Sequence, residues 1–271
     1  MSASGGARGA AHRAQHSSGL RALARAGYAA SGVVHLLIGW LAVRLAFGSS
    51  SGSADESGAF RELASTTGGT LILWAVTVGL AALALWQLAV AVVGDPGADD
   101  AKAAGARVKA AGKGVLYGVL AGTAARYATG AGGGGGEQES LTATLLQAPA
   151  GRWLVVGVGL AIVGVGVFHV VKGWRKTFLH DLHGSGGGTV AAAVERLGQV
   201  GYVAKGVALA VLGGLFVAAG VTHDADKAGG LDDALRTIRE QPFGTALLVV
   251  TGVGIAAYGV YSFARARYAR L

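Results

Sequence analysis

The stretch GYAASGVVHLLIGWLAVRLAF, residues 27–47, is an apolar run whose Gly32-Val33 recurs as Gly114-Val115 and Gly206-Val207. A helix of about 20 apolar residues crosses the ~30 Å hydrocarbon core of a bilayer. A second apolar segment follows each of these openings after about 37 residues. These second segments open at Gly69, Gly151 and Gly244. The pattern predicts three tandem repeats, each with two membrane-spanning helices.

The spacing of the first two repeats supports their common origin. Their offset is 82 residues, and it is kept without a gap from Gly32/Gly114 to Gly69/Gly151. The six predicted spans cover residues 27–47, 71–93, 108–129, 153–173, 200–219 and 246–263. The third span is the weakest in hydropathy, and we include it because it is equivalent to the first and the fifth.

The composition is that of a membrane protein. Hydrophobic residues make up 52% of the chain and charged residues 14%, with a mean hydropathy of +0.50, whereas soluble domains have about 25% charged residues. The 48 glycines allow helices to approach closely in lipid. The absence of cysteine excludes disulfides, thiolate nucleophiles and cysteine-ligated metals.

The fold class expected is an all-α integral membrane protein. Two spans return the chain to its starting side, so the three repeats are parallel and form a six-helix bundle with pseudo-three-fold symmetry about the membrane normal. The predicted organisation is a disordered tail followed by the three repeats. These segments are residues 1–19, 20–101, 102–188 and 189–271.

Short amphipathic helices are expected in the outward connections. They cover residues 55–63, 140–146 and 232–238, where apolar residues four apart follow a capping Ser or Asp. Pro149 and Pro242 end the second and third of them. The run 132–136 reads as a flexible glycine linker.

The distribution of charge predicts the orientation. The N-terminus, the 94–113 and 172–205 loops and the C-terminus hold 16 of the 23 Lys and Arg but 5 of the 15 acids. The positive-inside rule therefore places both termini in the cytoplasm of a cell-membrane protein. The net charge of +8 lies at helix ends, which argues against nucleic-acid binding. The expected partners are the lipid bilayer and a membrane protein, with the oligomeric state open.

Two segments, Gly27–Val34 and Gly201–Val207, resemble the repeat opening of a known family, as does Lys113–Tyr117. Gln241–Gly244 is similar to the mark before its second spans. The family is a class of actinobacterial integral membrane proteins, built from three tandem two-helix repeats, whose domain has no known function. The resemblance covers residues 20–268, implies the fold and implies no catalytic residue. Repeat two departs from it, with Lys109-Ala110 where the others have Gly-Tyr.

Arg44 and Arg126 are candidate ligand-binding residues because they share one repeat position near the outer ends of the first and third spans. An arginine there needs a partner or the interface. The pair can hold an anion, a carboxylate or a lipid headgroup. The alternative is that both reach the headgroups, or pair with Glu62 or Glu139.

Three further polar residues are candidates for ligand binding inside the spans: His35, Gln87 and His169. His35 is an intramembrane ionisable group. Gln87 and His169 share a repeat position with Ser262, which allows a polar ring near the axis. The alternatives are interhelical hydrogen bonds and interfacial positions.

Other motifs carry less chemistry. Gly114, Gly118 and Gly122 form a double GxxxG, typical of a helix–helix seam. His180, Asp181 and His183 lie beside a glycine run that argues against the order a zinc site needs, so we expect no metal and no cofactor.

Three functional readings follow. The first is a structural or accessory membrane component, and the second is a small channel or transporter for an anion or small solute. The third is a lipid-acting enzyme, for which no catalytic pair is found: Gly-x-Ser-x-Gly, His-Glu-x-x-His and a Walker loop are all absent. We expect that the protein is not an enzyme.

Overall fold

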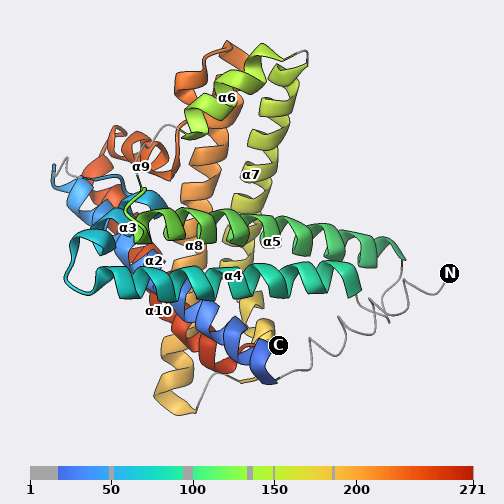
Figure 1. Ribbon diagram of the computed structural model, residues 1–271. Coiled ribbons are helices and arrows are strands. Elements are labelled where there is room, and N and C mark those ends of the chain that lie inside the picture. Colours follow the sequence, from blue (N-terminus) through green and yellow to red (C-terminus); the bar gives the residue numbers. More distant parts are fainter. Residues whose placement is uncertain are drawn as a thin grey trace. The chain divides into compact units, whose positions relative to one another are not determined.

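The computed structural model describes residues 18–48, 52–93, 100–132, 137–148, 150–184 and 187–270, and every element in these ranges is helical (Figure 1). The long helices are α2 (Ser18–Ala46), α4 (Gly69–Val93), α5 (Asp100–Ala128), α7 (Gly151–Trp174), α8 (Gly188–Thr222) and α10 (Gly244–Tyr268). The short elements are α3 (Glu56–Ser65), α6 (Glu137–Gln147), α9 (Leu231–Arg239) and the 3-10 turns η1 (Thr177–Asp181) and η2 (Ala225–Lys227).

The order of the helices follows the predicted repeat. A long, a short and a long helix occur three times, and each predicted span and amphipathic segment coincides with one helix. Three long helices begin eight or more residues before their predicted spans, because alanine-rich stretches there extend the helix. They are α2, which begins at Ser18, α5 at Asp100 and α8 at Gly188.

Three sequence predictions fall partly on residues that the structure leaves out. Residues 1–17 of the predicted tail lie outside the described residues, and α2 already begins at Ser18, inside that tail. Residues 133–136 of the glycine linker and Pro149 also lie outside them.

Five of the described helices are long and apolar enough to cross a membrane: α2, α4, α7, α8 and α10. The helix expected as the third span, α5, is 29 residues long but does not reach the same hydropathy. Lys113 and Arg126 both fall in its most apolar part, among glycines and alanines that add little hydropathy.

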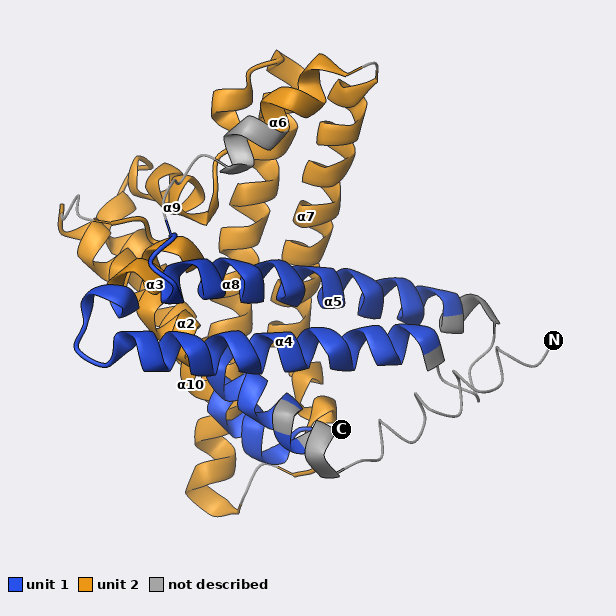
Figure 2. Cartoon of the chain, viewed as in Figure 1, with its two compact units in different colours: residues 1–31, 63–132, 262–271 blue, residues 32–62, 133–261 orange. Residues whose placement is uncertain are grey.

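The contacts divide the chain into two compact units (Figure 2). One comprises residues 1–31, 63–132 and 262–271, and the other comprises residues 32–62 and 133–261. The first unit contains the hairpin of α4 and α5. Its core cluster is formed by Ala24, Tyr28, Leu83, Trp86 and Ala269, with Val90, Tyr117 and Ala266 packed against it.

The second unit contains the antiparallel hairpin of α7 and α8, which pack side by side along glycines spaced seven residues apart (Figure 1). A methyl group on Gly166 would lie 2.7 Å from the carbonyl oxygen of Gly206, and one on Gly159 would lie 2.8 Å from that of Gly213. Backbone therefore rests on backbone, which is how small residues join helices in the absence of a hydrophobic driving force.

The same repeat positions form the contact between α10 and α2 in the second unit, where a methyl group on Gly259 would lie 2.8 Å from the carbonyl oxygen of Gly32. In the first unit, a methyl group on Gly114 of α5 would lie 3.4 Å from the carbonyl oxygen of Ala84 in α4. Each seam joins the second long helix of one repeat to the first long helix of the next, and the third repeat contacts the first.

The seam predicts opposite effects for two neighbouring glycines of α8. Gly213→Ala places a methyl group 2.6 Å from the backbone nitrogen of Val163, so we expect a loss of about 1–3 kcal/mol in the free energy of unfolding. Gly214 has nothing within 4 Å of the same position. Gly214→Ala should be neutral or stabilise the helix by up to about 1 kcal/mol.

Thermal unfolding of the two variants, purified in the same detergent, measures this difference. Equal shifts for both variants would contradict the close contact between α7 and α8.

Candidate functional site

His35 of α2 and Lys205 of α8 form a polar pair in the second unit. The Lys205 Nζ donates a hydrogen bond of 2.8 Å to His35 Nε2, and both side chains are half-buried. The ring of Tyr258, from α10, lies 4.8 Å from the imidazole and 4.5 Å from the ammonium nitrogen. Because an ammonium group only donates, the imidazole accepts at Nε2 and carries its proton at Nδ1.

Aromatic rings pack beside this pair. Tyr258 is 5.1 Å from Tyr202 and 6.0 Å from Tyr261 between ring centroids. Phe178 of η1 stacks on Tyr202 at 5.3 Å and is fully buried. The loop after α7 is therefore anchored by an aromatic side chain, a degree of order that the neighbouring glycine run had argued against.

The three polar residues predicted to form a ring, Gln87, His169 and Ser262, lie in different compact units. His169 donates from Nδ1 to the carbonyl oxygen of Val165 at 2.8 Å, and its ring lies 5.6 Å from Tyr202. Gln87 and Ser262 are both buried in the first unit, while His169 belongs to the second. A ring of the three stays a prediction.

Arg44, at the end of α2, lies near a carboxylate named in the alternative reading. Its Nη1 is 3.8 Å from Glu62 Oε1, with both side chains at least one-third exposed. A pair with that geometry contributes ~0–1 kcal/mol. Arg126 is exposed at the end of α5 and belongs to the other unit, so convergence of the two arginines stays a prediction.

The predicted glycine face of α5 is tight at only one end. A methyl group on Gly114 would lie 2.9 Å from Leu88, and one on Gly118 would lie 4.0 Å from Ala84. At Gly122 nothing lies within 4 Å. The longer glycine contact lies between α7 and α8. Glycines seven residues apart in both of these helices are the sequence signal that could have predicted this contact.

Two cation–aromatic contacts occupy equivalent repeat positions. Lys172 lies 5.4 Å from the ring of Tyr202, and Arg265 lies 4.4 Å from the ring of Tyr28. Arg265 also donates a hydrogen bond of 3.3 Å to the Tyr28 hydroxyl. In both cases the cation lies near the end of the second long helix of one repeat, and the tyrosine lies in the first long helix of the next repeat. The repeat offsets in the sequence therefore already relate the two pairs.

The His180-Asp181-x-His183 motif does not gather into a metal site. Asp181 accepts a hydrogen bond of 2.6 Å from Lys172. Within the described residues, no group of three or more His, Asp or Glu side chains is placed to hold a metal ion.

Asp232, at the start of α9, is a buried carboxylate that joins two of the connections between long helices. Its Oδ1 accepts the backbone N–H of Ala54 at 2.7 Å, and its Oδ2 accepts Nε of Arg236 at 2.6 Å. The carboxylate beside Arg236 raises the pKa of that guanidinium above its ordinary value. Repeat one is thus tied to repeat three outside the long helices.

Asp55, next to this contact, caps α3 by accepting the backbone N–H of Gly58 at 2.7 Å. Burial raises the pKa of the Asp55 carboxyl to about 6, with the negative charges of Glu56 and Asp232 acting in the same direction.

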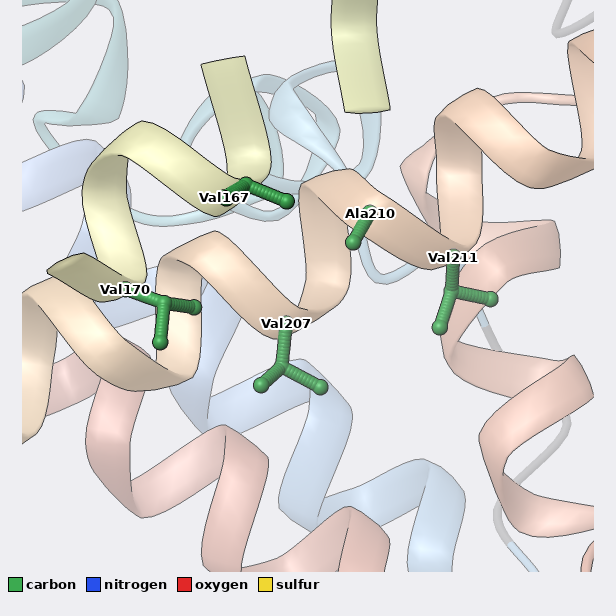
Figure 3. A pocket seen from close by; sticks show the side chains of 5 residues that line it. All are labelled: Val167, Val170, Val207, Ala210 and Val211. Atoms are coloured by element: carbon green, nitrogen blue, oxygen red, sulfur yellow. The ribbon is translucent and has the colours of Figure 1, made fainter. Parts of the chain in front are cut away.

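A shallow apolar groove of about 390 Å³ lies on the α7–α8 hairpin (Figure 3). Its lining consists of Val167, Val170, Val207, Ala210 and Val211. All five lining side chains are aliphatic, so the groove continues the apolar surface of the hairpin.

The family model described as "Domain of Unknown Function (DUF1206)" matches the chain three times, over residues 26–94, 108–176 and 200–269. The chain belongs to this family. The first two matches start 82 residues apart, as Gly32 and Gly114 do, so the prediction of three tandem repeats is confirmed.

A curated relative from Bacillus subtilis (strain 168), "Uncharacterized protein YxxB", is 26% identical over 251 residues, covering 92% of this chain and 91% of the relative. No solved structure matches the chain. The DUF1206 repeats agree with the resemblance in the sequence, whereas an actinobacterial source stays a prediction.

The raised pKa of Asp55 predicts how stability depends on pH. The folded protein holds this proton up to about pH 6, whereas the unfolded chain releases it near the ordinary value of 3.8. The free energy of unfolding therefore falls between about pH 4 and pH 6 and is level above that range. Asp55→Asn keeps the cap acceptor and removes the titration, so we expect about 1–2 kcal/mol of added stability near pH 7 and little change near pH 4.

Melting temperatures at both pH values test this expectation. Glu240→Gln, at an exposed carboxylate directly after α9, is the matched control and should show no such difference. A melting temperature of Asp55→Asn that follows the wild type at every pH would contradict it.

Proposed function

We propose that this DUF1206 protein is a structural or accessory component of the cell membrane: a six-helix bundle whose three parallel repeats close into a ring. The observation that carries the proposal is the repeated seam. Gly166 meets Gly206, Gly259 meets Gly32, and Ala84 meets Gly114, at the same position of each repeat boundary. Because the third repeat meets the first through that position, a closed ring satisfies all three contacts.

The exposed side chains support a lipid surround. Large apolar residues are exposed on every long helix, and water-facing patches of that kind are rare in soluble monomers. On α5 they include Val108, Val115, Leu116 and Val119, each more than half exposed. These residues support α5 as the sixth span, because lipid can cover them. The Lys and Arg side chains of α5 are long enough to reach the membrane interfaces.

The direction of insertion follows from charge. The helix ends and loops that hold most of the Lys and Arg, including Lys172, Lys176 and Arg265, belong on the cytoplasmic side, together with both termini. The outward side then holds α3, α6 and α9, where Asp232 and Asp55 lie. A partner for such a scaffold is another membrane protein, and no catalytic role is part of the proposal.

The alternative is a small channel or transporter for an anion or small solute. The observation that favours it is the Lys205–His35 pair within the apolar helices. The seams count against a path between neighbouring repeats, because backbone contacts at Gly159 and Gly166 leave no space there.

Disulfide cross-linking tests the ring, since the chain has no cysteine of its own. A Cβ added at Gly118 would lie 4.0 Å from that of Ala84, and one added at Gly252 would lie 3.1 Å from that of Ala42. The first separation suits a disulfide, and the second needs a small adjustment. In native membranes, we expect both double-cysteine variants to cross-link within one chain under mild oxidation.

The control pairs Ala84→Cys with Gly122→Cys, because nothing lies within 4 Å of a Cβ at Gly122. Cross-links that join two chains instead of one would overturn the closed ring.

Anion efflux from proteoliposomes separates the two functions. A structural component gives the same efflux as protein-free liposomes. Protein-dependent efflux that disappears in Lys205→Gln would instead establish the channel or transporter.

A further inference from the structure

The strongest unexplained feature outside the seams is the cation at Lys205. From Val200 to Thr222 it is the only charged residue of α8. Arg196, the preceding charge, lies nine residues earlier, about 14 Å along the helix. Lys205 itself is about 8 Å beyond Val200, where the apolar stretch begins, which places its ammonium within reach of the phosphate layer of a bilayer.

The groups around this ammonium are neutral. His35 supplies a lone pair at 2.8 Å and Tyr258 supplies a ring face at 4.5 Å. Both contacts orient the cation, but neither cancels its charge. Five other cations of the described residues are paired with acids. They are Arg44 with Glu62, Lys172 with Asp181, Lys176 with Glu195, Lys227 with Asp224 and Arg236 with Asp232.

The sequence offers no acid at this depth. The five apolar helices contain a single Asp or Glu, Glu195, which is ten residues before Lys205 and pairs with Lys176. A charge in a low-dielectric region is costly unless a counter-ion or the interface compensates it. Since the helices supply no carboxylate, an anion from outside the chain is the chemistry that fits.

We propose that Lys205 is the charged ligand of a binding site for a phosphate group, with its ammonium held in place by His35 Nε2 and by the ring face of Tyr258. Lysine binds phosphate as a point charge. One N–H of the Lys205 ammonium donates to His35, and the other two N–H groups of the ammonium can donate to a phosphate. The phosphate belongs either to a lipid headgroup or to a soluble anion entering from the same end of α8. The site needs α8 in a bilayer, but it does not depend on the closed ring.

The internal repeats provide matched variants. Ser31 stands in repeat one where Lys205 stands in repeat three, so Lys205→Ser introduces a residue that the fold already uses at this position. Lys113 is the equivalent in repeat two, and the residue equivalent to His35 in the following repeat is Leu209. Lys113→Ser therefore removes the same charge from a position that has no histidine counterpart.

Binding is measured as a rise in melting temperature of the full-length protein under two conditions. One is inorganic phosphate titrated in neutral detergent at constant ionic strength. The other is reconstitution into nanodiscs of phosphatidylcholine with or without phosphatidylglycerol. A rise with inorganic phosphate identifies a soluble anion, and a rise confined to phosphatidylglycerol identifies a lipid headgroup.

In the condition that stabilises the wild type, Lys205→Gln and Lys205→Ser should weaken the apparent affinity by roughly tenfold or more, as expected for one charge-assisted hydrogen bond. Lys205→Arg and Lys113→Ser should keep it. The second neutral variant covers the case in which the first does not fold. The absence of a rise in both conditions, or an equal rise in the neutral variants, overturns the proposal, whatever the cross-linking experiment shows for the ring.

Discussion

The contact on which the structure depends is the approach of two helix backbones at glycine. In lipid, helices gain little from burying apolar side chains, so close packing of backbone and small residues has to hold them together. The contact of Gly166 with Gly206 meets that requirement within one hairpin. The contact of Gly259 with Gly32 meets it between the two ends of the chain. The large apolar side chains are thereby left for the lipid.

The charged side chains near the helix ends and in the connections also have defined contacts. Cations near helix ends rest on aromatic rings or acids, as Lys172 does with Tyr202 and Asp181. On the opposite connections, the buried Asp232 is satisfied by the N–H of Ala54 and by Arg236. Lys205 shares the ring contact, but its second contact is a neutral imidazole where Lys172 has a carboxylate. An ionisable group that departs from its local pattern is a reasonable place to look for a ligand.

Length and hydropathy predict five of the six long helices, and the repeat offset, which the first two family matches share, adds α5. The sequence ranked the site residues less well. His35 is a candidate in the sequence but Lys205 is not, because one sequence does not reveal which side chain of another helix lies 2.8 Å away. For Arg44 the sequence leaves two interpretations open, and the contact with Glu62 fits one of them, because both residues lie near the predicted outer end of the first span.

The three seams are alike but not equal, and the differences follow from single residues. Where the later seams have glycine on both helices, the first has Ala84 against Gly114, and the gap widens to 3.4 Å. The cation and tyrosine that close the later seams are replaced here by Val90 and Ala110. The boundary between the first two repeats therefore has less backbone contact and no charge–ring contact at this position.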